Sequence, residues 1–270
     1  MNDKIIRLAL LGKDVSASRS KQIHQFILDE LGYVCEYELL SVNREDLDFA
    51  MRRLMGDFYG FNVTVPYKRD VMAYLNEIKD DAFTYGSVNT VVAQTGVGYN
   101  TDGVGFMLML QDNGVSVIDK KVLILGCGGA GRSCAAALKT AGAKVYIYQR
   151  NKEKLTEVCA ELGVSSIENP EMGGFDILIN CTGVGMRDTV GQSPVTKAAF
   201  KGAKIAIDLI YRPKETEFLR LAKERNLHTI NGDAMLFYQA YYSDCLYLAR
   251  QADETQARAL YQKYLTKYED

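Results

Sequence analysis

The order of apolar and polar positions predicts alternating strands and helices in the first hundred residues. An apolar run at 5–12 has strand length, and apolar side chains three or four positions apart at 23–31 predict the helix that follows. Residues 34–42 alternate with a period of two, and residues 47–54 return to helical spacing before Gly56. These segments form two successive strand–helix units.

The next segment contains a proline. A β-branched strand is predicted at 60–65, and Pro66 is expected to open a helix that continues to Ile78, because its missing N–H costs little in a first helical turn. Two short strands, 87–94 and 96–100, then complete an open α/β layer.

From residue 104 the pattern becomes that of a nucleotide-binding domain. A helix is predicted at 104–114, and residues 120–150 read as buried strand, glycine turn, alanine-rich helix and second buried strand. Further buried strands are predicted at 175–183 and 203–211. We therefore expect an α/β protein whose second domain is a doubly wound Rossmann-type sheet.

The predicted domain limits follow from this change of pattern. Residues 1–103 are expected to form an open α/β substrate-binding and catalytic domain, and residues 104–238 the nucleotide-binding domain. The last helices, at roughly 234–251 and 253–267, are expected to return to the first domain, which residues 239–270 complete. A length of 270 residues fits two modest domains at about 150 residues each.

Composition narrows the class of protein. Apolar residues make up 47% and charged residues 24% of the chain, as in soluble globular proteins, and no apolar run reaches the roughly 20 residues of a membrane span. The apolar run near the N-terminus is short and lacks a cleavage pattern, so it predicts a strand and not a secretory signal. A cytoplasmic location is expected.

Charge and metal-binding residue types favour small-molecule partners. The net charge is −2, which disfavours nucleic acid as a partner. The six cysteines are scattered without a C-x-x-C pair, which disfavours a zinc site and a disulfide framework. With only two histidines, a His-rich metal site or a Ser-His-Asp hydrolase is hard to build. No metal is expected.

The glycine turn between the first two strands of the second domain predicts a dinucleotide site. The motif G-x-G-x-x-G lies between a strand and a helix, where a pyrophosphate can approach backbone amides at the positive helix N-terminus. A glycine turn without a nucleotide is the alternative, and the complete strand–turn–helix–strand context disfavours it. The motif residues are Gly126, Gly128, Gly129, Ala130 and Gly131.

The end of the second strand of this domain indicates which dinucleotide binds. NAD-binding domains place an acid there for the ribose, whereas residues 148–151 contain none. Arg150 and Lys154 have the charge and geometry to hold a 2′-phosphate. The alternative is a solvated first helical turn, but positive charge there opposes the helix dipole. NADP is therefore favoured.

Two residues of the first domain can supply acid–base chemistry. Reduction of a ketone needs a hydrogen-bond and proton donor at its oxygen. Lys68 and Asp102 each follow a predicted strand, at ends that a parallel sheet would place along one crevice, and an aspartate can orient an ammonium. From spacing alone, a surface lysine and a turn aspartate are the stronger alternatives.

Several motifs in a specific order identify a resemblance. They are Ser18-x-Ser20, NVTVPYK at 62–68, GSVNT at 86–90, NTDG at 100–103, GCGGAGR at 126–132, NCTGVGM at 180–186, DLIY at 208–211 and MLFYQA at 235–240. With these motifs the chain resembles the shikimate dehydrogenases over nearly its whole length. That family reduces 3-dehydroshikimate to shikimate with NADPH, in aromatic amino-acid biosynthesis.

The resemblance implies roles for individual residues. Lys68 and Asp102 would be the catalytic pair, and the cleft between the domains would hold both ligands. Ser18 and Ser20 would bind the substrate carboxylate, although Ser20 could equally cap the helix that follows. The residues implied to contact the substrate hydroxyls are Thr64, Asn89 and Gln239, and Tyr211 would lie close to the substrate. The implied cofactor contacts beyond the glycine turn are Arg150, Asn151, Lys154, Thr182, Gly232 and Met235.

The chain also departs from the family pattern. The segment 12–21 lacks the family's two prolines and its histidine, so it is expected to be less stiff. Gln149 and Asn151 replace the family's usual asparagine and hydroxyl residue. Alternatives therefore stay open: a quinate or aminoshikimate dehydrogenase of the same family, or a non-catalytic sensor of NADP or a metabolite. A monomer or a homodimer fits equally.

Overall fold

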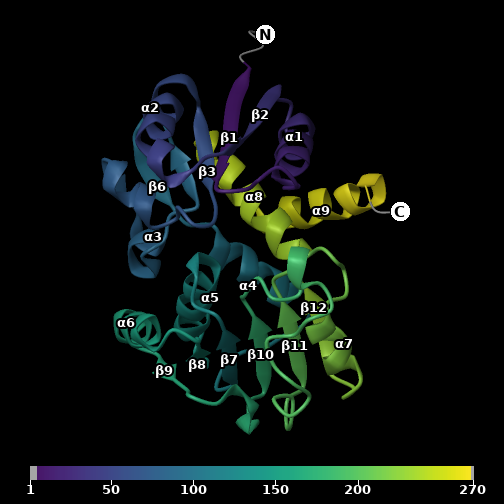
Figure 1. Ribbon diagram of the computed structural model, residues 1–270. Helices are drawn as coiled ribbons and strands as arrows, with labels where there is room; N and C mark the ends of the chain where they lie inside the picture. Colours follow the sequence, from purple (N-terminus) through teal and green to yellow (C-terminus); the bar gives the residue numbers. More distant parts are fainter. Residues whose placement is uncertain (1–4, 269–270) are drawn as a thin grey trace. The chain divides into compact units, whose positions relative to one another are not determined.

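The computed structural model describes residues 5–268, which divide into two compact units (Figure 1). The first unit comprises residues 1–105 and 236–270, and the second comprises residues 106–235. The limits fall inside two helices, α4 (Asp102–Asp112) and α8 (Asp233–Tyr247), so each of these helices begins in one unit and ends in the other.

The first unit is built on a six-stranded sheet with the strand order β2-β1-β3-β5-β6-β4. Only β5 runs antiparallel to its neighbours, so the sheet is mixed and most of its strands are parallel. The strands are β1 (Ile6–Gly12), β2 (Cys35–Ser41), β3 (Gly60–Val63), β4 (Glu77–Ile78), β5 (Thr90–Val92) and β6 (Val97–Tyr99).

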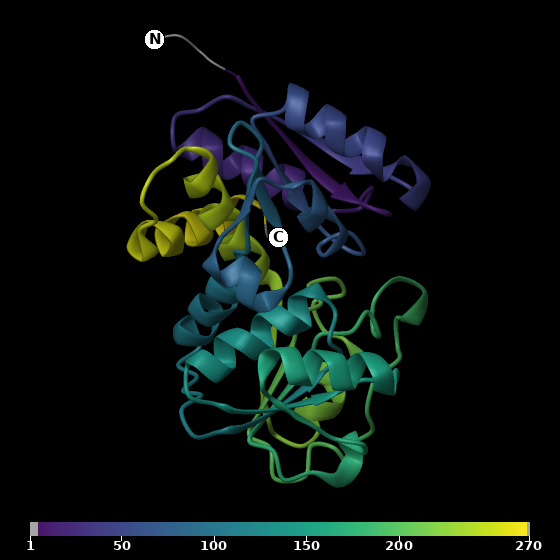
Figure 2. The ribbon, with the colours of Figure 1, turned by 90° about the vertical axis from the view of Figure 1, so that its left-hand side faces the viewer.

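Helices cover both faces of this sheet because β1 is apolar on both sides. Ala9 and Leu11 pack with α2 (Leu47–Asp57), whereas Leu8 and Leu10 pack with side chains of α1 (Ser20–Glu30) and α8. Figure 2 shows α1 and α2 on opposite sides of β1. The remaining helices of the unit are α3 (Asp80–Tyr85) and α9 (Glu254–Tyr268).

The helix predicted after Pro66 is wrong. The chain makes a turn, a short 3₁₀ helix (Asp70–Tyr74) and then the edge strand β4. The N–H groups of Asn76 and Lys79 donate to the carbonyls of Gly96 and Gly98, both at 2.9 Å, so pairing with β6 replaces helical hydrogen bonds. Helix α3 was not predicted.

The second unit confirms the predicted Rossmann-type architecture. Its parallel sheet has the order β12-β11-β10-β7-β8-β9, so the chain starts in the middle and builds outward in both directions. The strands are β7 (Lys121–Leu125), β8 (Lys144–Tyr148), β9 (Ser165–Ser166), β10 (Ile177–Asn180), β11 (Ile205–Asp208) and β12 (His228–Asn231). The helices are α5 (Gly129–Thr140), α6 (Lys152–Leu162) and α7 (Glu217–Lys223).

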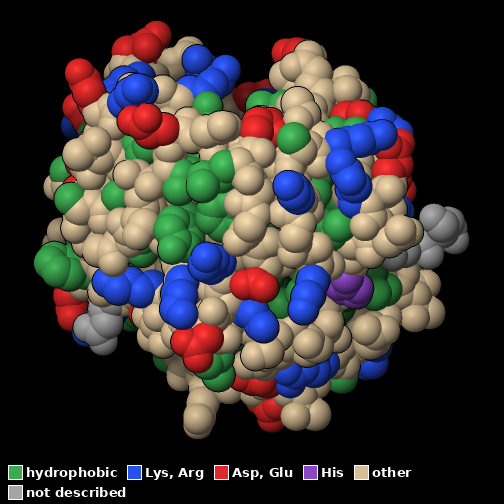
Figure 3. Space-filling view, turned by 90° about the horizontal axis from the view of Figure 1, so that it is seen from below, with side chains coloured by type: hydrophobic (Ala, Val, Ile, Leu, Met, Phe, Trp, Pro, Cys, Tyr) green, Lys and Arg blue, Asp and Glu red, His purple; other side chains and the backbone are tan. Residues whose placement is uncertain are grey.

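Charged side chains of both signs are mixed on the face shown in Figure 3, as the net charge of −2 leads one to expect. Across residues 5–268, no helix is both long enough and apolar enough to cross a membrane.

Candidate active site

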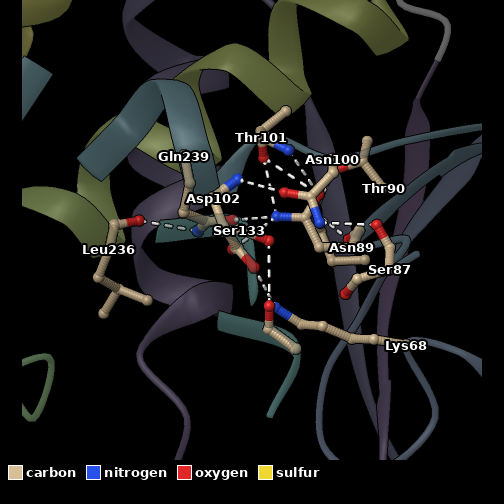
Figure 4. A network of polar contacts seen from close by, with 12 residues as sticks. Lys68, Ser87, Asn89, Thr90, Asn100, Thr101, Asp102, Ser133, Leu236 and Gln239 are labelled. Atoms are coloured by element: carbon tan, nitrogen blue, oxygen red, sulfur yellow. Dashed lines mark hydrogen bonds and ion pairs between the residues drawn. The ribbon is translucent and has the colours of Figure 1, made fainter. Parts of the chain in front are cut away.

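Lys68 and Asp102 form an ion pair in the first unit (Figure 4). The Lys68 Nζ atom lies 2.5 Å from Asp102 Oδ2, and the two side chains are 12% and 7% exposed. A charge-assisted hydrogen bond of this length orients the ammonium group. Neither residue is therefore an ordinary solvated surface side chain.

The ends of β3 and β6 bring the pair together. Both strands run antiparallel to β5, so they are parallel to each other, and their carboxyl ends lie at the same edge of the sheet. The Lys68 carbonyl accepts the Val88 N–H at 2.8 Å, and the Val63 N–H donates to the Asn89 carbonyl at 2.8 Å. The turn that carries Lys68 is thus tied to the chain that enters β5.

Asn89 organises this edge of the sheet. Its Nδ2 donates to Asp102 Oδ1 at 2.8 Å, and its Oδ1 accepts the Thr101 N–H at 2.9 Å. The Asp102 N–H donates to Asn100 Oδ1 at 2.9 Å, and Asn100 in turn donates to the Ser87 carbonyl at 2.7 Å. Both carboxylate oxygens of Asp102 are therefore engaged, one by Asn89 and the other by Lys68.

Ser243 is a central residue of the network that the sequence reasoning missed. Its Oγ lies 2.7 Å from Thr90 Oγ1 and 3.0 Å from Thr101 Oγ1, and it accepts from Asn62 Nδ2 at 3.2 Å. It also donates to the Gln239 carbonyl at 2.9 Å. The available signal was a serine four positions after Gln239 in a helix rich in aromatic residues.

Two of the residues assigned by resemblance to the substrate hydroxyls meet at this edge. Gln239 Oε1 lies 3.4 Å from Asn89 Nδ2, and Gln239 Nε2 donates to the Leu236 carbonyl at 2.8 Å. Thr64 follows β3 at the same edge; its N–H donates to the Leu11 carbonyl at 2.8 Å, and its side chain is partly exposed. Three predicted substrate residues thus stand near the carboxyl ends of the strands.

Ser18 and Ser20 lie where β1 leads into α1. The Ser18 Oγ donates to Ser20 Oγ at 3.0 Å and accepts the Ser20 N–H at 3.2 Å. The alternative reading of Ser20 as a helix cap is wrong, because Arg19 occupies the N-cap position and Ser20 is the first residue of the helix. The two hydroxyl groups face each other.

The glycine turn of the second unit has the close approaches that its motif predicts. Gly126 has a φ of +94°, and a Cβ on Gly131 would lie 2.3 Å from the Gly126 carbonyl oxygen, so helix α5 packs directly on the turn. A Cβ on Gly128 would meet nothing within 4 Å, which leaves space beside the N-terminus of α5. Gly129 and Ala130 are the first two residues of that helix.

Thr182 borders the glycine turn. A Cβ on Gly126 would lie 2.8 Å from Thr182 Cγ2. The Thr182 hydroxyl donates to Asn180 Oδ1 at 2.6 Å, and Asn180 Nδ2 donates to both oxygens of Asp208 at 3.1 Å. Burial raises the pKa of Asp208 to about 6, although hydrogen bonds from Thr216 and others oppose the shift. The NCTG and DLIY motifs thus hold one another in place.

The residues proposed for the 2′-phosphate lie just beyond β8. Arg150, Asn151 and Lys154 are exposed, and Asn151 is the N-cap of α6, where its side chain accepts the Lys154 N–H at 3.0 Å. The cap fixes where the helix begins and satisfies one of its free amides. Among the described hydrogen bonds and ion pairs, none involves the side chain of Arg150 or Lys154.

The remaining predicted ligand contacts lie in the second unit. Tyr211 follows β11 and is partly buried. Gly232 is buried, and a Cβ there would lie 2.0 Å from the Leu209 carbonyl oxygen. Met235 is 7% exposed, close to the start of α8. Their roles stay predictions.

Among the described hydrogen bonds, none joins a histidine to Lys68 or Asp102. His24 is fully buried, and its Nδ1 lies 2.6 Å from Asp244 Oδ1, while His228 is on β12. Burial raises the pKa of Asp244, against the influence of His24. Within residues 5–268 no group of three or more His, Cys, Asp or Glu side chains is arranged to hold a metal ion.

Comparison of family models with the chain finds two matches. The model described as shikimate dehydrogenase substrate binding domain matches residues 10–91, and that described as NADP oxidoreductase coenzyme F420-dependent matches residues 121–210. These segments fall in the first and the second unit, respectively.

Individual relatives match over most of their length. The shikimate dehydrogenase (NADP(+)) of Carboxydothermus hydrogenoformans is 39% identical, with 85% of this chain and 87% of the relative covered. That of Methanococcus maripaludis is 35% identical, with coverage of 94% and 95%.

Solved structures agree with these relatives. Shikimate dehydrogenase 1 from Peptoclostridium difficile has a TM-score of 0.89 at 32% identity, covering 96% of this chain and 97% of that one. The Thermus thermophilus shikimate 5-dehydrogenase in complex with NADP(H) and shikimate has a TM-score of 0.87 at 32% identity, covering 96% and 99%. The chain therefore belongs to the shikimate dehydrogenase family.

Proposed function

We propose that the protein catalyses the reversible, NADP-dependent reduction of 3-dehydroshikimate to shikimate. The observation that carries this proposal is the 2.5 Å contact between Lys68 and Asp102, held by Asn89 at the carboxyl ends of the strands. Relatives 35–39% identical over most of the chain are shikimate dehydrogenases (NADP(+)), and a structural neighbour binds both shikimate and NADP(H).

Lys68 is the proton donor in this proposal. When the ketone carbon accepts a hydride, its oxygen gains negative charge and takes a proton from Lys68 Nζ; in the reverse direction the neutral amine takes the proton back. Asp102 orients Nζ through one carboxylate oxygen, and Asn89 holds the carboxylate in place through the other. Bound NADPH supplies the hydride.

The first unit supplies the substrate contacts in the proposal. Ser18 and Ser20 offer two adjacent hydroxyl donors, which suit a carboxylate. Asn89, Gln239 and Thr64 present polar groups near the Lys68–Asp102 pair, as a small hydroxyl-rich acid requires. Tyr211 of the second unit is proposed to approach the same substrate.

The second unit is proposed to hold the cofactor, and its residues fit one. The space beside Gly128 at the N-terminus of α5 suits a pyrophosphate, because the first amides of a helix lack intrahelical partners. The exposed Arg150 and Lys154 suit a 2′-phosphate, and Asn151 fixes their helix end. Gly232 and Met235 are proposed to flank the nicotinamide, and Thr182 is proposed to lie by the cofactor.

The test is steady-state oxidation of shikimate with NADP, followed by absorbance of the reduced nicotinamide. Lys68→Met should lower kcat by about 10²- to 10⁴-fold, the range lost with a general acid or base. The matched control is Lys263→Met, because Lys263 is an exposed lysine of the same unit that pairs with Glu30 at the surface.

The same assay separates the alternatives. If the protein oxidises quinate faster than shikimate, or prefers NAD to NADP, the proposed function becomes that of a family member with changed specificity. Tight binding of NADP and shikimate without turnover would replace it with the sensor. Full activity in Lys68→Met would remove the lysine from the mechanism.

A cytoplasmic location and a monomeric or homodimeric state remain predictions of the same proposal. Size-exclusion chromatography coupled to light scattering decides the second of these.

A further inference from the structure

The segment from Gly12 to Ser20 carries the two proposed carboxylate donors without any proline. Its first half is tied to neighbouring strands. The Gly12 carbonyl accepts the Val42 N–H at 2.9 Å, and the Val15 N–H donates to Ser41 Oγ at 3.1 Å. The following residues, 16 and 17, are exposed. The contacts of residues 18–20 therefore determine the positions of the two serine hydroxyls.

Arg19, the residue between the two serines, reaches the C-terminal helix. Its Nη2 donates to Tyr264 Oη at 3.0 Å, and its Cζ lies 5.4 Å from the centre of the Tyr264 ring. The contact spans 245 residues of sequence and joins the start of α1 to α9. An arginine held by both a hydrogen bond and a ring face has few other conformations.

Tyr264 is a rigid anchor for this contact. The residue is 1% exposed, and its ring packs against Phe26 and Phe237 at centroid distances of 5.3 and 5.2 Å. Its hydroxyl also donates to Gln22 Oε1 at 3.0 Å, so one oxygen connects Arg19, the N-cap of α1, with Gln22 in the first turn of that helix.

We propose that Tyr264 is a positioning residue that, through Arg19, holds Ser18 and Ser20 in the conformation that binds the substrate carboxylate. The inference rests on the proposed function. Loss of the Tyr264 hydroxyl removes the hydrogen bond from the Arg19 guanidinium while the ring contact stays. Arg19 is then less ordered, and the free energy of ordering the serines opposes substrate binding.

The test compares Tyr264→Phe with Tyr268→Phe. Tyr268 is on the same helix and packs against Tyr264 at 5.0 Å and Phe26 at 5.9 Å, but it is 37% exposed. Tyr264→Phe should raise KM for shikimate by about 2- to 10-fold, as expected for one hydrogen bond, with kcat and KM for NADP unchanged. Tyr268→Phe should leave all three unchanged.

Two further measurements distinguish positioning from a general loss of structure. Tyr264→Phe should weaken the binding of shikimate methyl ester less than it raises KM for shikimate, because the ester lacks the carboxylate charge. The ester is assayed as a substrate or as a competitive inhibitor. Hydrogen–deuterium exchange of the ligand-free protein should accelerate at residues 16–20 in Tyr264→Phe but not in Tyr268→Phe. Arg19→Met should reproduce both effects, and the double variant should add little to either single one.

Unchanged exchange at residues 16–20, or an equal rise in KM for shikimate, its ester and NADP, would overturn the inference. The exchange measurement needs no turnover. If the unaltered protein does not oxidise shikimate, the proposed function fails, and exchange still decides whether Tyr264 holds the serine segment.

Discussion

Replacement of Gly128 by alanine and replacement of Gly131 by alanine should have opposite effects on cofactor binding and on stability, although both residues belong to the glycine motif. A Cβ on Gly128 would enter open space, whereas a Cβ on Gly131 would lie 2.3 Å from the Gly126 carbonyl oxygen. Gly128→Ala should therefore leave the fold intact and obstruct the cofactor. Gly131→Ala should weaken the packing of α5 on its strand before any ligand is considered.

The magnitudes follow from these contacts. At Gly128 the φ of −71° suits alanine. Alanine is a weaker helix cap than glycine, but it lowers the entropy of the unfolded chain, and these two effects roughly offset each other. The change in unfolding free energy should therefore stay within about 1 kcal/mol. Losing a hydrogen bond to a phosphate costs about 1.5–3 kcal/mol, or roughly 10- to 150-fold in Kd for NADP. At Gly131 the carbonyl must retreat, which costs about 1–3 kcal/mol.

Calorimetry and thermal unfolding of the purified variants measure these quantities separately. Gly131→Ala should lower the melting temperature by about 2–12 °C, since 1 kcal/mol corresponds to roughly 2–4 °C for a protein of this size. Gly128→Ala should melt within a few degrees of the unaltered protein, at about 2–4 °C per kcal/mol, but bind NADP weakly in titration calorimetry. Shikimate binding should be unchanged in Gly128→Ala.

Unaltered NADP affinity in Gly128→Ala would refute the placement of the pyrophosphate beside this residue. A stable Gly131→Ala would refute the packing argument instead, and each result leaves the other prediction standing.

Three further predictions rest on other contacts. Burial raises the pKa of Asp208 to about 6, above 3.8 for the free group, so the stabilisation it contributes is complete below about pH 4 and is lost as the pH rises through 6. In the unaltered protein this decline should amount to about 3 kcal/mol, because the pKa is raised by roughly two units. Denaturant titrations between about pH 4 and pH 6 should show no such decline in the unfolding free energy of Asp208→Asn. Ser243→Ala should destabilise the protein by about 1–3 kcal/mol, because a buried hydroxyl with four neighbours is lost, and equal denaturation midpoints would contradict this. Replacing Arg150 and Lys154 together by alanine should reduce the preference of kcat/KM for NADP over NAD by roughly tenfold or more, and an unchanged ratio would place the 2′-phosphate elsewhere.

Local pattern was a good guide wherever a segment's structure depends on its immediate neighbours. The buried strand, glycine turn and helix at 121–140 were predictable, because strand periodicity, glycine freedom and helix spacing act over a few residues. The resemblance extended this to Lys68, Asp102 and Asn89, which the structure brings together in one network. Spacing alone left the first two as ordinary surface residues.

Contacts between distant segments decided the rest. The chain after Pro66 reads as a helix by its apolar spacing, but pairing with β6 makes it a turn and an edge strand. The place of Ser243 among three strand ends, and the reach of Arg19 to Tyr264 on the last helix, depend on which faces the helices bury. Local periodicity thus predicted most of the strands and helices, and the order of the motifs identified most residues of the site. Which side chains share a hydrogen bond depends on how distant segments pack together, because those partners lie up to 245 residues apart.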